Sequence, residues 1–306
     1  MTKIGIIGAG QLGQMLGYAA NRLGLECIFL DPSDDPPAAS AGPVRKFAFD
    51  SEEGLKQLAA DVDVITYEFE NVPVGAVRNL PAGTLVYPPP QALEVAQDRL
   101  AEKTLFQKLD IPVPGFRAID SSEDLRTAGE ELGLPIVLKT RRLGYDGKGQ
   151  RVVRTAADIE TAVADLGGAD LIAEQWVPFD FEVSAIGARN ASGAIVHYPL
   201  SRNEHQNGIL HISRAPGDYQ SLQETAVSYL ERLMHELDYV GVLALELFVR
   251  DEALLANEFA PRVHNSGHWT IEGATTSQFE NHLRAILDMP PGSTEVKAPA
   301  GMLNLI

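Results

Sequence analysis

The sequence predicts an α/β domain with a parallel sheet, followed by an α+β domain with antiparallel strands. At the start of the chain, Lys3–Ile7 has the pattern of a buried strand, Gln11–Leu23 that of an apolar-periodic helix, and Cys27–Leu30 that of a second strand. Beyond about residue 90 the pattern changes to pairs of strands with interposed helices. The 306 residues, 45% hydrophobic and 22% charged, are enough to bury two cores that share a cleft.

The first domain is expected to cover residues 1–90. The loop Asp31–Pro43 is rich in Pro, Asp and Ser, so no regular structure is expected in it. A helix near Glu52–Ala60 and a strand at Val62–Thr66 continue the α/β pattern. Pro88-Pro89-Pro90 ends the domain, and one helix from about Gln91 to Leu109 begins the second domain, which takes up residues 91–306.

The second domain is expected to contain a series of short strands. They are Ile136–Arg141, Gln150–Arg154, Leu171–Trp176 and Glu182–Ala188, with a helix near Ala156–Leu166 before the third. Asn190–Gly193 has the composition of a turn between two strands. The apolar segment Gly301–Ile306 reads as a strand whose burial requires more chain or another subunit.

Charge and apolar run length exclude several classes of protein. A formal net charge of −17 repels a phosphate backbone, so neither DNA nor RNA is expected as a partner. The longest apolar runs, such as Val240–Leu247, are far shorter than the roughly 20 residues that cross a bilayer, so no membrane association is expected. Met1–Leu16 lacks the features of a secretion signal, and Cys27 has no second cysteine to pair with. These observations predict a cytoplasmic location.

A dinucleotide-type glycine motif follows the first strand. Gly8-Ala9-Gly10-Gln11-Leu12-Gly13 opens the first helix, and Asp31 stands at the end of the next strand. Taken alone, this pattern is typical of a nicotinamide-dependent oxidoreductase. The same glycines serve any tight strand-to-helix turn, including one that holds a different anion at the helix N-terminus, and we favour this second interpretation.

A second glycine-rich segment, Leu143–Gln150, lies between two predicted strands. It lacks the Gly-Lys-Ser/Thr ending of a P-loop. Lys139, Arg141, Arg142 and Lys148 surround it, and Gly144, Gly147 and Gly149 leave backbone N–H groups open to phosphate oxygens. The alternative is an ordinary Asp-Gly hairpin turn with solvated basic residues. We favour a mobile phosphate lid, although the composition of the loop leaves both interpretations open.

Two glutamates in consecutive strands are expected to form a metal site. In Val242–Val249 the side chains alternate, so Glu246 lies on the face opposite the leucines. A three-residue loop, Asp251–Ala253, would bring Glu246 opposite Glu258, with the carboxylates about 5 Å apart. Such a pair either keeps a proton or binds a cation, and Mg²⁺ suits two carboxylates plus substrate phosphates. The alternative is two solvated glutamates on an edge hairpin.

The segment after the second glutamate concentrates polar side chains. Residues 257–268 contain Arg262, His264, Asn265 and His268 in one irregular stretch. Each histidine alone would more often be structural. Beside the acid pair, the group together favours an anion or oxyanion site.

These motifs resemble those of a known enzyme family. One set of residues follows the order and character of the motifs of the ATP-grasp ligases. The set is Lys139, Gly144–Gln150, Glu174–Val177, Glu182, Glu246, Asn257-Glu258 and Pro261-Arg262. More narrowly, five segments are similar to motifs of the N5-carboxyaminoimidazole ribonucleotide synthetases of purine biosynthesis. They are Gly10–Gly13, Asp98-Arg99, Gly144–Gln150, His205–Gly208 and Arg262–His268. The similarity runs from Lys3 to Ile306.

The resemblance implies a fold and a reaction. It implies a Rossmann-like pre-ATP-grasp domain, then an ATP-grasp fold with a lid subdomain at about 115–178, and a small C-terminal domain that is largely absent. The reaction implied is carboxylation of aminoimidazole ribonucleotide with ATP and bicarbonate through carboxyphosphate, by a homodimer. The protein aligns the reactants and offsets charge and forms no covalent intermediate.

The resemblance also implies roles for individual residues. Nucleotide contacts are implied for Arg99, Lys139, Gly144, Tyr145, Asp146, Gly147, Lys148, Gly149, Gln150, Glu174, Gln175, Trp176, Val177, Glu182, His205, Asn257 and Glu258. Mg²⁺ is implied at Glu246 and Glu258. Arg262, His264 and Asn265 would handle bicarbonate and carboxyphosphate, with Lys139 and Arg262 offsetting the charge on the transferred group. The acceptor ribonucleotide would contact Gln11, Glu68, Tyr145, Lys148, Arg262 and His264.

Three other functions remain open at this point. A related ATP-grasp ligase or a formate-using transformylase would share the nucleotide and metal sites but use a different acceptor. A nicotinamide-dependent oxidoreductase would leave the acid pair and the second glycine segment without a purpose. A catalytically silent nucleotide-binding module would bind ATP without releasing phosphate.

Overall fold

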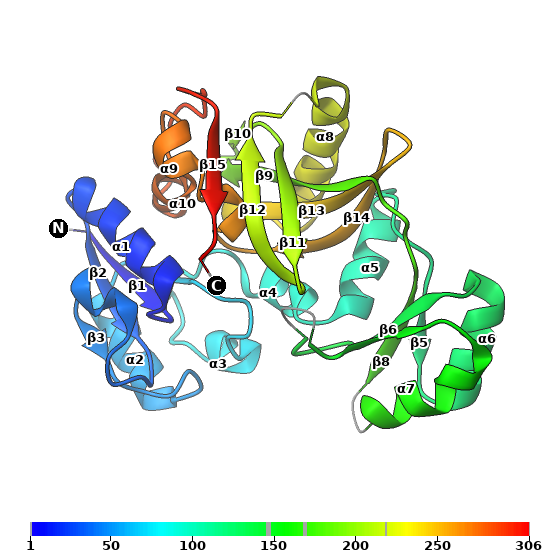
Figure 1. Ribbon diagram of the computed structural model, residues 1–306. Helices are drawn as coiled ribbons and strands as arrows, with labels where there is room; N and C mark the ends of the chain where they lie inside the picture. The colour runs from blue at the N-terminus through cyan, green and yellow to red at the C-terminus, as the bar shows by residue number, and fades with distance from the viewer. Residues whose placement is uncertain (1, 145–147, 168–169, 218, 306) are drawn as a thin grey trace.

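The computed structural model describes residues 2–144, 148–167, 170–217 and 219–305. In these residues the strands form three sheets, and Figure 1 shows them as an N-terminal body in blue, a small green body and a larger central body. The described helices include none with the length and apolar character needed to cross a membrane.

The N-terminal body is the predicted parallel α/β sheet. Its strand order is β3-β2-β1-β4, with β1 Lys3–Ile7, β2 Glu26–Leu30, β3 Val44–Arg45 and β4 Val64–Tyr67, all paired in parallel. The helices are α1 Gln11–Arg22, α2 Glu52–Asp61 and α3 Val74–Arg78. One expectation was wrong: the proline-rich loop contains a short 3₁₀ helix, η1 Pro37–Ser40, because Pro37 is compatible with a first helical position.

The central body is an antiparallel sheet. Its order is β14-β13-β9-β11-β12-β15, with β10 paired to β9. The strands are β9 Phe181–Arg189, β10 Ile195–His197, β11 Ser201–Gln206, β12 Ile209–Ala215, β13 Gly241–Arg250, β14 Ala253–Ala260 and β15 Ala300–Leu303. The last strand forms as expected, and β15 pairs with the edge of β12, while Leu303 and Leu305 stay exposed.

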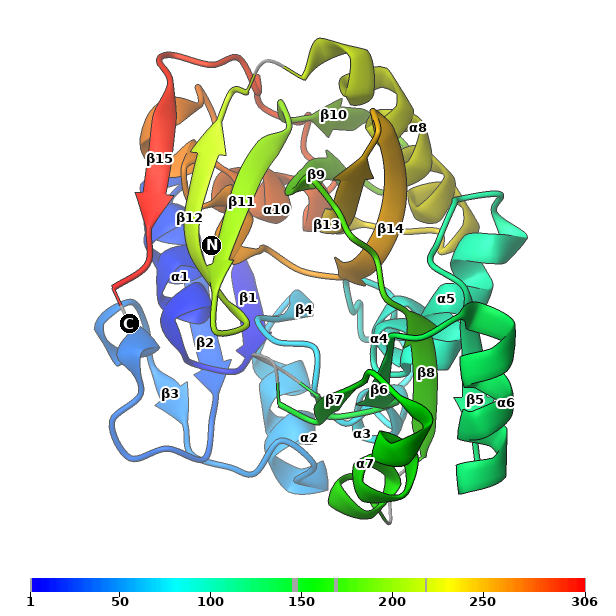
Figure 2. The same cartoon turned by 45° about the vertical axis from the view of Figure 1, so that its right-hand side comes forward.

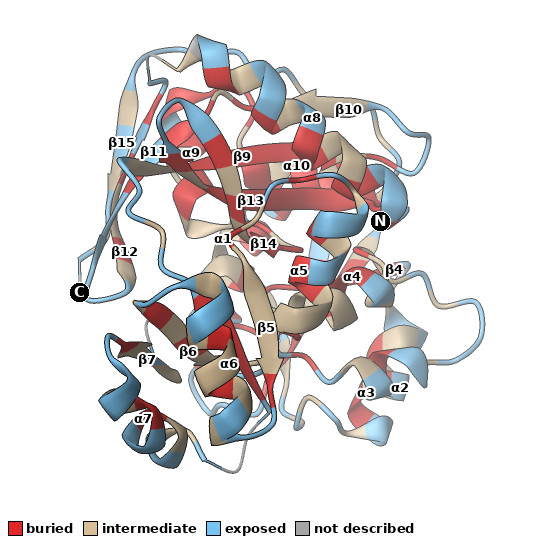
Figure 3. Ribbon diagram, turned by 90° about the vertical axis from the view of Figure 1, so that its right-hand side faces the viewer, coloured by how far each residue is buried: buried red, intermediate tan, exposed pale blue. Residues whose placement is uncertain are grey.

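Alternation along β13 divides the central body into two cores. Leu243 and Leu245 pack with helix α8 (Gln220–Glu236), whereas Ala244 faces α1 and α10 (Gln278–Ile286). Helix α9 (Thr270–Gly273) and the 3₁₀ turn η3 (Asn265–Gly267) connect β14 to α10. Figure 3 shows that β9 and β13, in the middle of the molecule, are buried along most of their lengths. Glu246 belongs to the same face as Ala244, as the alternation predicts.

The small body has its own sheet and its own core. Its order is β5-β8-β6-β7, with β5 Phe116–Ile119, β6 Ile136–Thr140, β7 Gln150–Val153 and β8 Leu171–Gln175. Helices α6 (Ser122–Leu132), η2 (Ala156–Asp158) and α7 (Ile159–Asp165) accompany the sheet. Figure 2 shows this body below the β11–β12 hairpin of the central sheet. Movement of the small body as a lid stays a prediction.

The single helix expected at 91–109 is two helices, α4 Pro90–Ala96 and α5 Arg99–Lys108. The chain leaves helical geometry at Asp98, whose φ is −132°. Its carboxylate accepts a hydrogen bond from Leu100 N and so caps α5. Gln97 supports the break, because its side-chain amide donates to the carbonyl oxygens of Glu70 and Val72, each at 2.7 Å.

Candidate active site

A cavity of about 640 Å³ lies where the three bodies meet. Most of the residues that the motifs single out line it: Arg99, Lys139, Gly144, Lys148, Gln150, Glu174, Gln175, Trp176, Val177, Glu182, His205, Glu246, Asn257, Glu258, Arg262, His264 and Asn265. Tyr145, Asp146 and Gly147 lie outside the described residues. Gly149 lies between lining residues, and Gln11 and Glu68 do not line this cavity.

The acid pair forms as predicted, but by a different route. Glu246 lies opposite Glu258 in the β13–β14 register. The hairpin loop has two residues, Asp251 and Glu252, both with positive φ (50° and 62°), and not the expected three. A bulge between Glu246 and Leu247 then shifts the register by one residue. The error in loop length and the unforeseen bulge cancel, so the two glutamates still face one another.

The acid pair is electrostatically costly without a cation. Burial, followed by the charge of Glu258, raises the pKa of Glu246 to about 8. The expectation that one member of the pair keeps a proton agrees with this shift. Among the described side chains, no group of three or more His, Cys, Asp or Glu could hold a metal ion alone. A divalent ion at this pair therefore needs further ligands such as phosphate oxygens and water.

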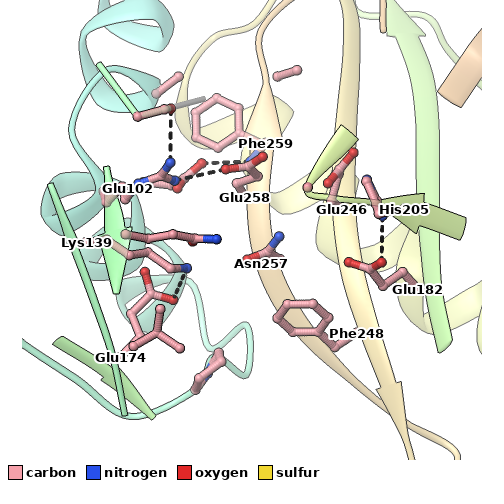
Figure 4. Close-up of a pocket in the computed structure, with 18 of the residues that line it drawn as sticks. Glu102, Lys139, Glu174, Glu182, His205, Glu246, Phe248, Asn257, Glu258 and Phe259 are labelled. Carbon is pink, nitrogen blue, oxygen red and sulfur yellow. Dashed lines mark hydrogen bonds and ion pairs between the residues drawn. The ribbon is translucent and has the colours of Figure 1, made fainter. Parts of the chain in front are cut away.

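Helix α5 supports the bulged strand β14 with side chains that the sequence analysis missed. Lys103 Nζ donates to Asn257 O at 2.7 Å. Phe259 N donates to Glu102 Oε1 at 2.7 Å (Figure 4). These backbone groups lie on either side of Glu258, on the outer edge of the sheet. One signal was available in the sequence: residues 99, 102, 103 and 106 share one helix face, and Phe106 marks that face as buried.

Arg99 connects the acid pair to the glycine segment. Its Nη1 donates to Glu258 Oε2 at 3.0 Å, and its Nη2 donates to Gly144 O at 3.1 Å. The arginine thus neutralises Glu258 in this structure. Its position allows the guanidinium to contact a phosphate that enters between the two groups.

A buried lysine–glutamate pair on β6 and β8 forms the cavity wall that the small body contributes. Lys139 Nζ donates to Glu174 Oε2 at 3.0 Å, and Lys103 Nζ lies 3.4 Å from the same oxygen. Burial opposes ionisation of Glu174, but the charges of Lys139 and Lys103 outweigh it and lower its pKa to about 2. Among the described residues, Glu174 Oε1 is buried and accepts no hydrogen bond. Such an oxygen needs a donor, which a ligand amino group can supply.

The second glycine segment is the loop of an antiparallel hairpin. Lys139 pairs with Gln150, and Thr140 N donates to Gly149 O at 2.8 Å. Glycine is required at 149, where φ is +70° and a Cβ would lie 2.7 Å from Thr140 Oγ1. The segment is therefore a hairpin whose residues Gly144, Lys148 and Gln150 line the cavity, and its role as a phosphate lid stays a prediction.

The basic residues around that loop divide into two sets. Arg141 makes a bidentate contact with Asp98, at 3.0 and 2.6 Å, and Arg142 adds a bond at 3.1 Å. These two arginines therefore join the small body to the start of α5. Arg141, Lys139 and Lys148 line the cavity, and a contact of the basic residues with phosphate stays a prediction.

The opposite wall of the cavity comes from the central sheet. His205 Nδ1 lies 2.6 Å from Glu182 Oε2, and this partner raises the pKa of His205 although burial alone would lower it. Nearby, the rings of Phe179 and Phe248 stack at 4.7 Å with an interplanar angle of 9°. Both rings line the cavity and give it an apolar surface.

In the polar segment 257–268, Arg262 makes contacts with both Glu70 and Val263. Its Nε donates to Glu70, a residue that the sequence analysis missed, and its Nη1 donates to Val263 O at 3.0 Å. Burial would raise the pKa of Glu70, but Arg262 lowers it to about 2. His264 and Asn265 line the cavity beside this arginine. His268 does not line it: its ring packs 5.6 Å from that of Phe279, as a structural histidine does.

The backbone of the first glycine motif binds the side chain of Glu68, from the same chain. The Glu68 carboxylate accepts hydrogen bonds from Gly10 N and Gly13 N at the start of α1. A Cβ at Gly8 would lie 2.5 Å from Glu68 Cγ, so glycine is needed for this approach. Burial raises the pKa of Glu68 despite these bonds. The carboxylate takes the place of a dinucleotide phosphate, which argues against nicotinamide binding; the exposed Gln11 lies beside it.

Comparison with known proteins agrees with this geometry. A ribonucleotide synthetase preATP-grasp domain matches residues 1–97, and an ATP-grasp domain matches residues 104–279. The chain is 50% identical over 304 residues to an N5-carboxyaminoimidazole ribonucleotide synthase of Pseudomonas aeruginosa, covering 99% of this chain and 84% of that protein.

Solved structures give the same result. The N5-carboxyaminoimidazole ribonucleotide synthetase of Thermus thermophilus has a TM-score of 0.95 at 52% identity, covering 99% of this chain and 83% of that one. The synthase of Aspergillus clavatus, in complex with ADP and 5-aminoimidazole ribonucleotide, has a TM-score of 0.92 at 32% identity, covering 100% and 82%. With its acid pair, Lys139–Glu174 and Arg262 around one cavity, the chain belongs to the N5-carboxyaminoimidazole ribonucleotide synthase family of ATP-grasp ligases.

Proposed function

We propose that this chain carboxylates 5-aminoimidazole ribonucleotide to N5-carboxyaminoimidazole ribonucleotide, using ATP and bicarbonate, with carboxyphosphate as the intermediate. One observation carries the proposal: a nucleotide-type pair (Lys139–Glu174), a facing acid pair (Glu246–Glu258) and an anchored arginine (Arg262) line the same cavity. A relative described with ADP and the aminoimidazole ribonucleotide supports the identity of the acceptor.

The nucleotide is assigned to the wall that carries Glu174. The adenine amino group would supply the donor that Glu174 Oε1 lacks, and backbone groups of 174–177 would read the adenine ring. Glu182 and His205 would hold the ribose. Arg99, Lys139 and the segment 144–150 would contact the phosphates, where Lys139 offsets the charge on the transferred group.

Mg²⁺ is assigned to Glu246 and Glu258, and the donor set fits it. Two facing carboxylates with phosphate oxygens and water form the all-oxygen environment that this ion takes. The raised pKa of Glu246 reflects the repulsion that a cation would remove. When bound, the ion would neutralise charge on the phosphates and orient them. Asn257, in the bulge, lies beside the pair.

Bicarbonate is assigned to Arg262, His264 and Asn265. A bicarbonate oxygen attacks the γ-phosphorus, the bond to the β-phosphate oxygen breaks, and ADP leaves. The exocyclic amine then attacks the carbon of carboxyphosphate, the carbon–oxygen bond to phosphate breaks, and the amine loses a proton. Arg262, held by Glu70, stabilises the negative charge in both steps. Gln11, Glu68, Tyr145 and Lys148 are proposed to hold the acceptor.

The proposal is tested by measuring ADP release with ATP alone, with added bicarbonate, and with bicarbonate plus the aminoimidazole ribonucleotide. We expect release to require bicarbonate, and ¹³C from labelled bicarbonate to appear in the carboxylated amine. Release that depends on formate would show a transformylase. No release under any condition would show a silent nucleotide-binding module.

Other predictions concern the organisation of the protein. Division at about residue 90, movement of 115–178 as a lid, assembly as a homodimer and a cytoplasmic location are proposed on the family resemblance and the sequence. Domain movement is testable by hydrogen exchange with and without ADP. The homodimer is testable by sedimentation.

A further inference from the structure

His264 has two chemically different neighbours, one at each ring nitrogen. Nδ1 lies 2.8 Å from Ser266 Oγ and accepts a hydrogen bond from Ser266 N at 3.3 Å. Nε2 lies 3.5 Å from Oε1 of Glu246, and both residues line the cavity. The imidazole therefore caps the turn η3 with one nitrogen and presents the other to the site.

Ser266 decides where the ring carries its proton, through its peptide N–H and its closer hydroxyl together. A peptide N–H can only donate, so Nδ1 must accept, and the hydroxyl of Ser266 then donates to the same nitrogen. Because Nδ1 keeps the lone pair that accepts from the peptide N–H, it carries no hydrogen, and the ring is the neutral imidazole. A neutral ring whose Nδ1 accepts has its hydrogen on Nε2.

The surroundings hold this arrangement from both sides. The fully buried Gln278 clamps the backbone of His264: His264 N donates to Gln278 Oε1 at 3.0 Å, and Gln278 Nε2 donates to His264 O at 2.6 Å. Ser266 is also fully buried, and its carbonyl accepts a hydrogen bond from Ser213 Oγ at 3.1 Å. Neither the ring nor Ser266 can turn without breaking buried hydrogen bonds.

We propose that Ser266 is a positioning residue that holds His264 in its Nε2–H tautomer, so that the ring donates a hydrogen bond into the cavity and does not act as a base there. The identity of the group that accepts this hydrogen bond rests on the proposed function, which assigns it to an oxygen of bicarbonate or carboxyphosphate. Nε2–H has no lone pair for the proton that the acceptor amine loses, and the Nδ1 lone pair is engaged by Ser266. That proton leaves to water or to a phosphate oxygen.

The tautomer is tested directly by NMR on protein labelled with ¹⁵N-histidine, without substrates. The chain has seven histidines, and His264 is assigned by the signal lost in His264→Asn. We expect a protonated Nε2 and an unprotonated Nδ1 at neutral pH. A protonated Nδ1, or protonation of both nitrogens, would overturn the proposal. This result does not depend on the reaction, so it stays decisive even if bicarbonate fails to stimulate ATP hydrolysis.

The positioning role is tested with Ser266→Ala, which removes the hydroxyl but keeps the peptide N–H. We expect the second tautomer to become detectable and kcat/KM for bicarbonate to fall about 10-fold, with ADP affinity unchanged. Ser213→Ala is the matched control, because it disturbs the same buried network without touching the ring, and its His264 should keep the Nε2–H form. Unchanged tautomer and kinetics in Ser266→Ala, or an equal loss of ADP affinity, would sink the positioning role.

Discussion

At the residue scale, two facing carboxylates dominate the site. Glu246 and Glu258 lie opposite one another in adjacent strands, and Arg99 neutralises the second of them. The sequence pattern brought both to one face, but the strand register depends on a bulge that no local motif announces. The chemistry of the site therefore depends on one extra residue, Asn257, in β14.

Replacing Glu258 with glutamine is expected to abolish bicarbonate-dependent ATP hydrolysis, a loss on the order of 100-fold or more. The amide removes the charge that a divalent ion requires, while its size and hydrogen bonding keep the fold intact. ADP release measures the effect, and circular dichroism checks the fold. Glu252→Gln, at the exposed tip of the same hairpin, is the control and should retain activity. Near wild-type turnover in Glu258→Gln would refute the metal assignment.

Glu102 is expected to make stability depend on pH. Burial, followed by the charge of Glu258, raises its pKa to about 8, against about 4.3 in an unfolded chain. Between these values the folded state binds the extra proton, so stability falls as pH rises. Glu102→Gln should flatten this slope by at most about 1.4 kcal/mol per pH unit, measured by urea unfolding between pH 5 and 8 without metal.

A second substitution at this position separates charge from hydrogen bonding. Glu102→Leu also removes the acceptor of Phe259 N, so it should be about 1–3 kcal/mol less stable than Glu102→Gln at every pH in that range. Glu102→Gln keeps an acceptor oxygen and should lose less. A slope in Glu102→Gln equal to that of the wild type would contradict the raised pKa.

At the element scale, the break between α4 and α5 organises the nucleotide wall. Asp98 caps α5 and at the same time binds Arg141 and Arg142 of the small body. The apolar pattern continues through residues 91–109, so periodicity alone predicted one helix. The residues that bind Asp98 at the break between the helices, Arg141 above all, are distant in sequence. Helix propensity depends on neighbouring residues only, so it does not predict the break.

Asp98→Ala is expected to lower the free energy of unfolding by about 1 kcal/mol through the lost cap. It should also weaken ADP binding about 10-fold, because Arg99 and the loop that starts after Arg141 lose their common anchor. Ser121→Ala is the matched control, since Ser121 caps α6, a helix that contributes no residue to the cavity lining, whereas α5 contributes Arg99. Equal ADP affinities in the two variants would show that the Asp98 contacts do not position the site. Calorimetry measures both effects.

At the scale of the whole molecule, buried polar side chains join the N-terminal sheet to the central one. His282 on α10 lies 2.9 Å from Thr66 Oγ1 of β4 through Nε2, and its Nδ1 accepts a hydrogen bond from Val242 N of β13 at 3.1 Å. The ring is fully buried. This contact joins the N-terminal body to β13, the strand that carries Glu246.

His282 is expected to contribute to acid denaturation. Burial lowers its pKa to about 4, against about 6.5 in an unfolded chain, so between these values only the unfolded state binds the proton. Stability from this group is therefore present above pH 6.5 and lost as pH falls toward 4. His282→Gln should lower stability at pH 8 by about 1–3 kcal/mol but make the acid loss shallower, as followed by urea unfolding. A wild-type acid slope would contradict this.

Local pattern was sufficient for much of the protein. Alternation placed Glu246 on the face away from the leucines, the glycine turn and its flanking strands predicted the parallel sheet, and motif order indicated the ATP-grasp family. These features depend on side-chain periodicity and on backbone freedom at glycine, which are properties of neighbouring residues. The sequence by itself therefore determined the class of fold and most of the cavity residues.

Tertiary structure alone decided how those residues are held and charged. Three sets of contacts join residues more than 40 positions apart in the sequence. They are the hydrogen bonds of Glu102 and Lys103 to β14, the ion pair of Arg141 with Asp98, and the hydrogen bonds of the Glu68 carboxylate at the first glycine turn. Their energies depend on burial and on the distance between charges, neither of which exists before the chain folds. For this reason the sequence could predict that Glu246 and His264 belong to the site, whereas only the folded structure determines the protonation state of each side chain.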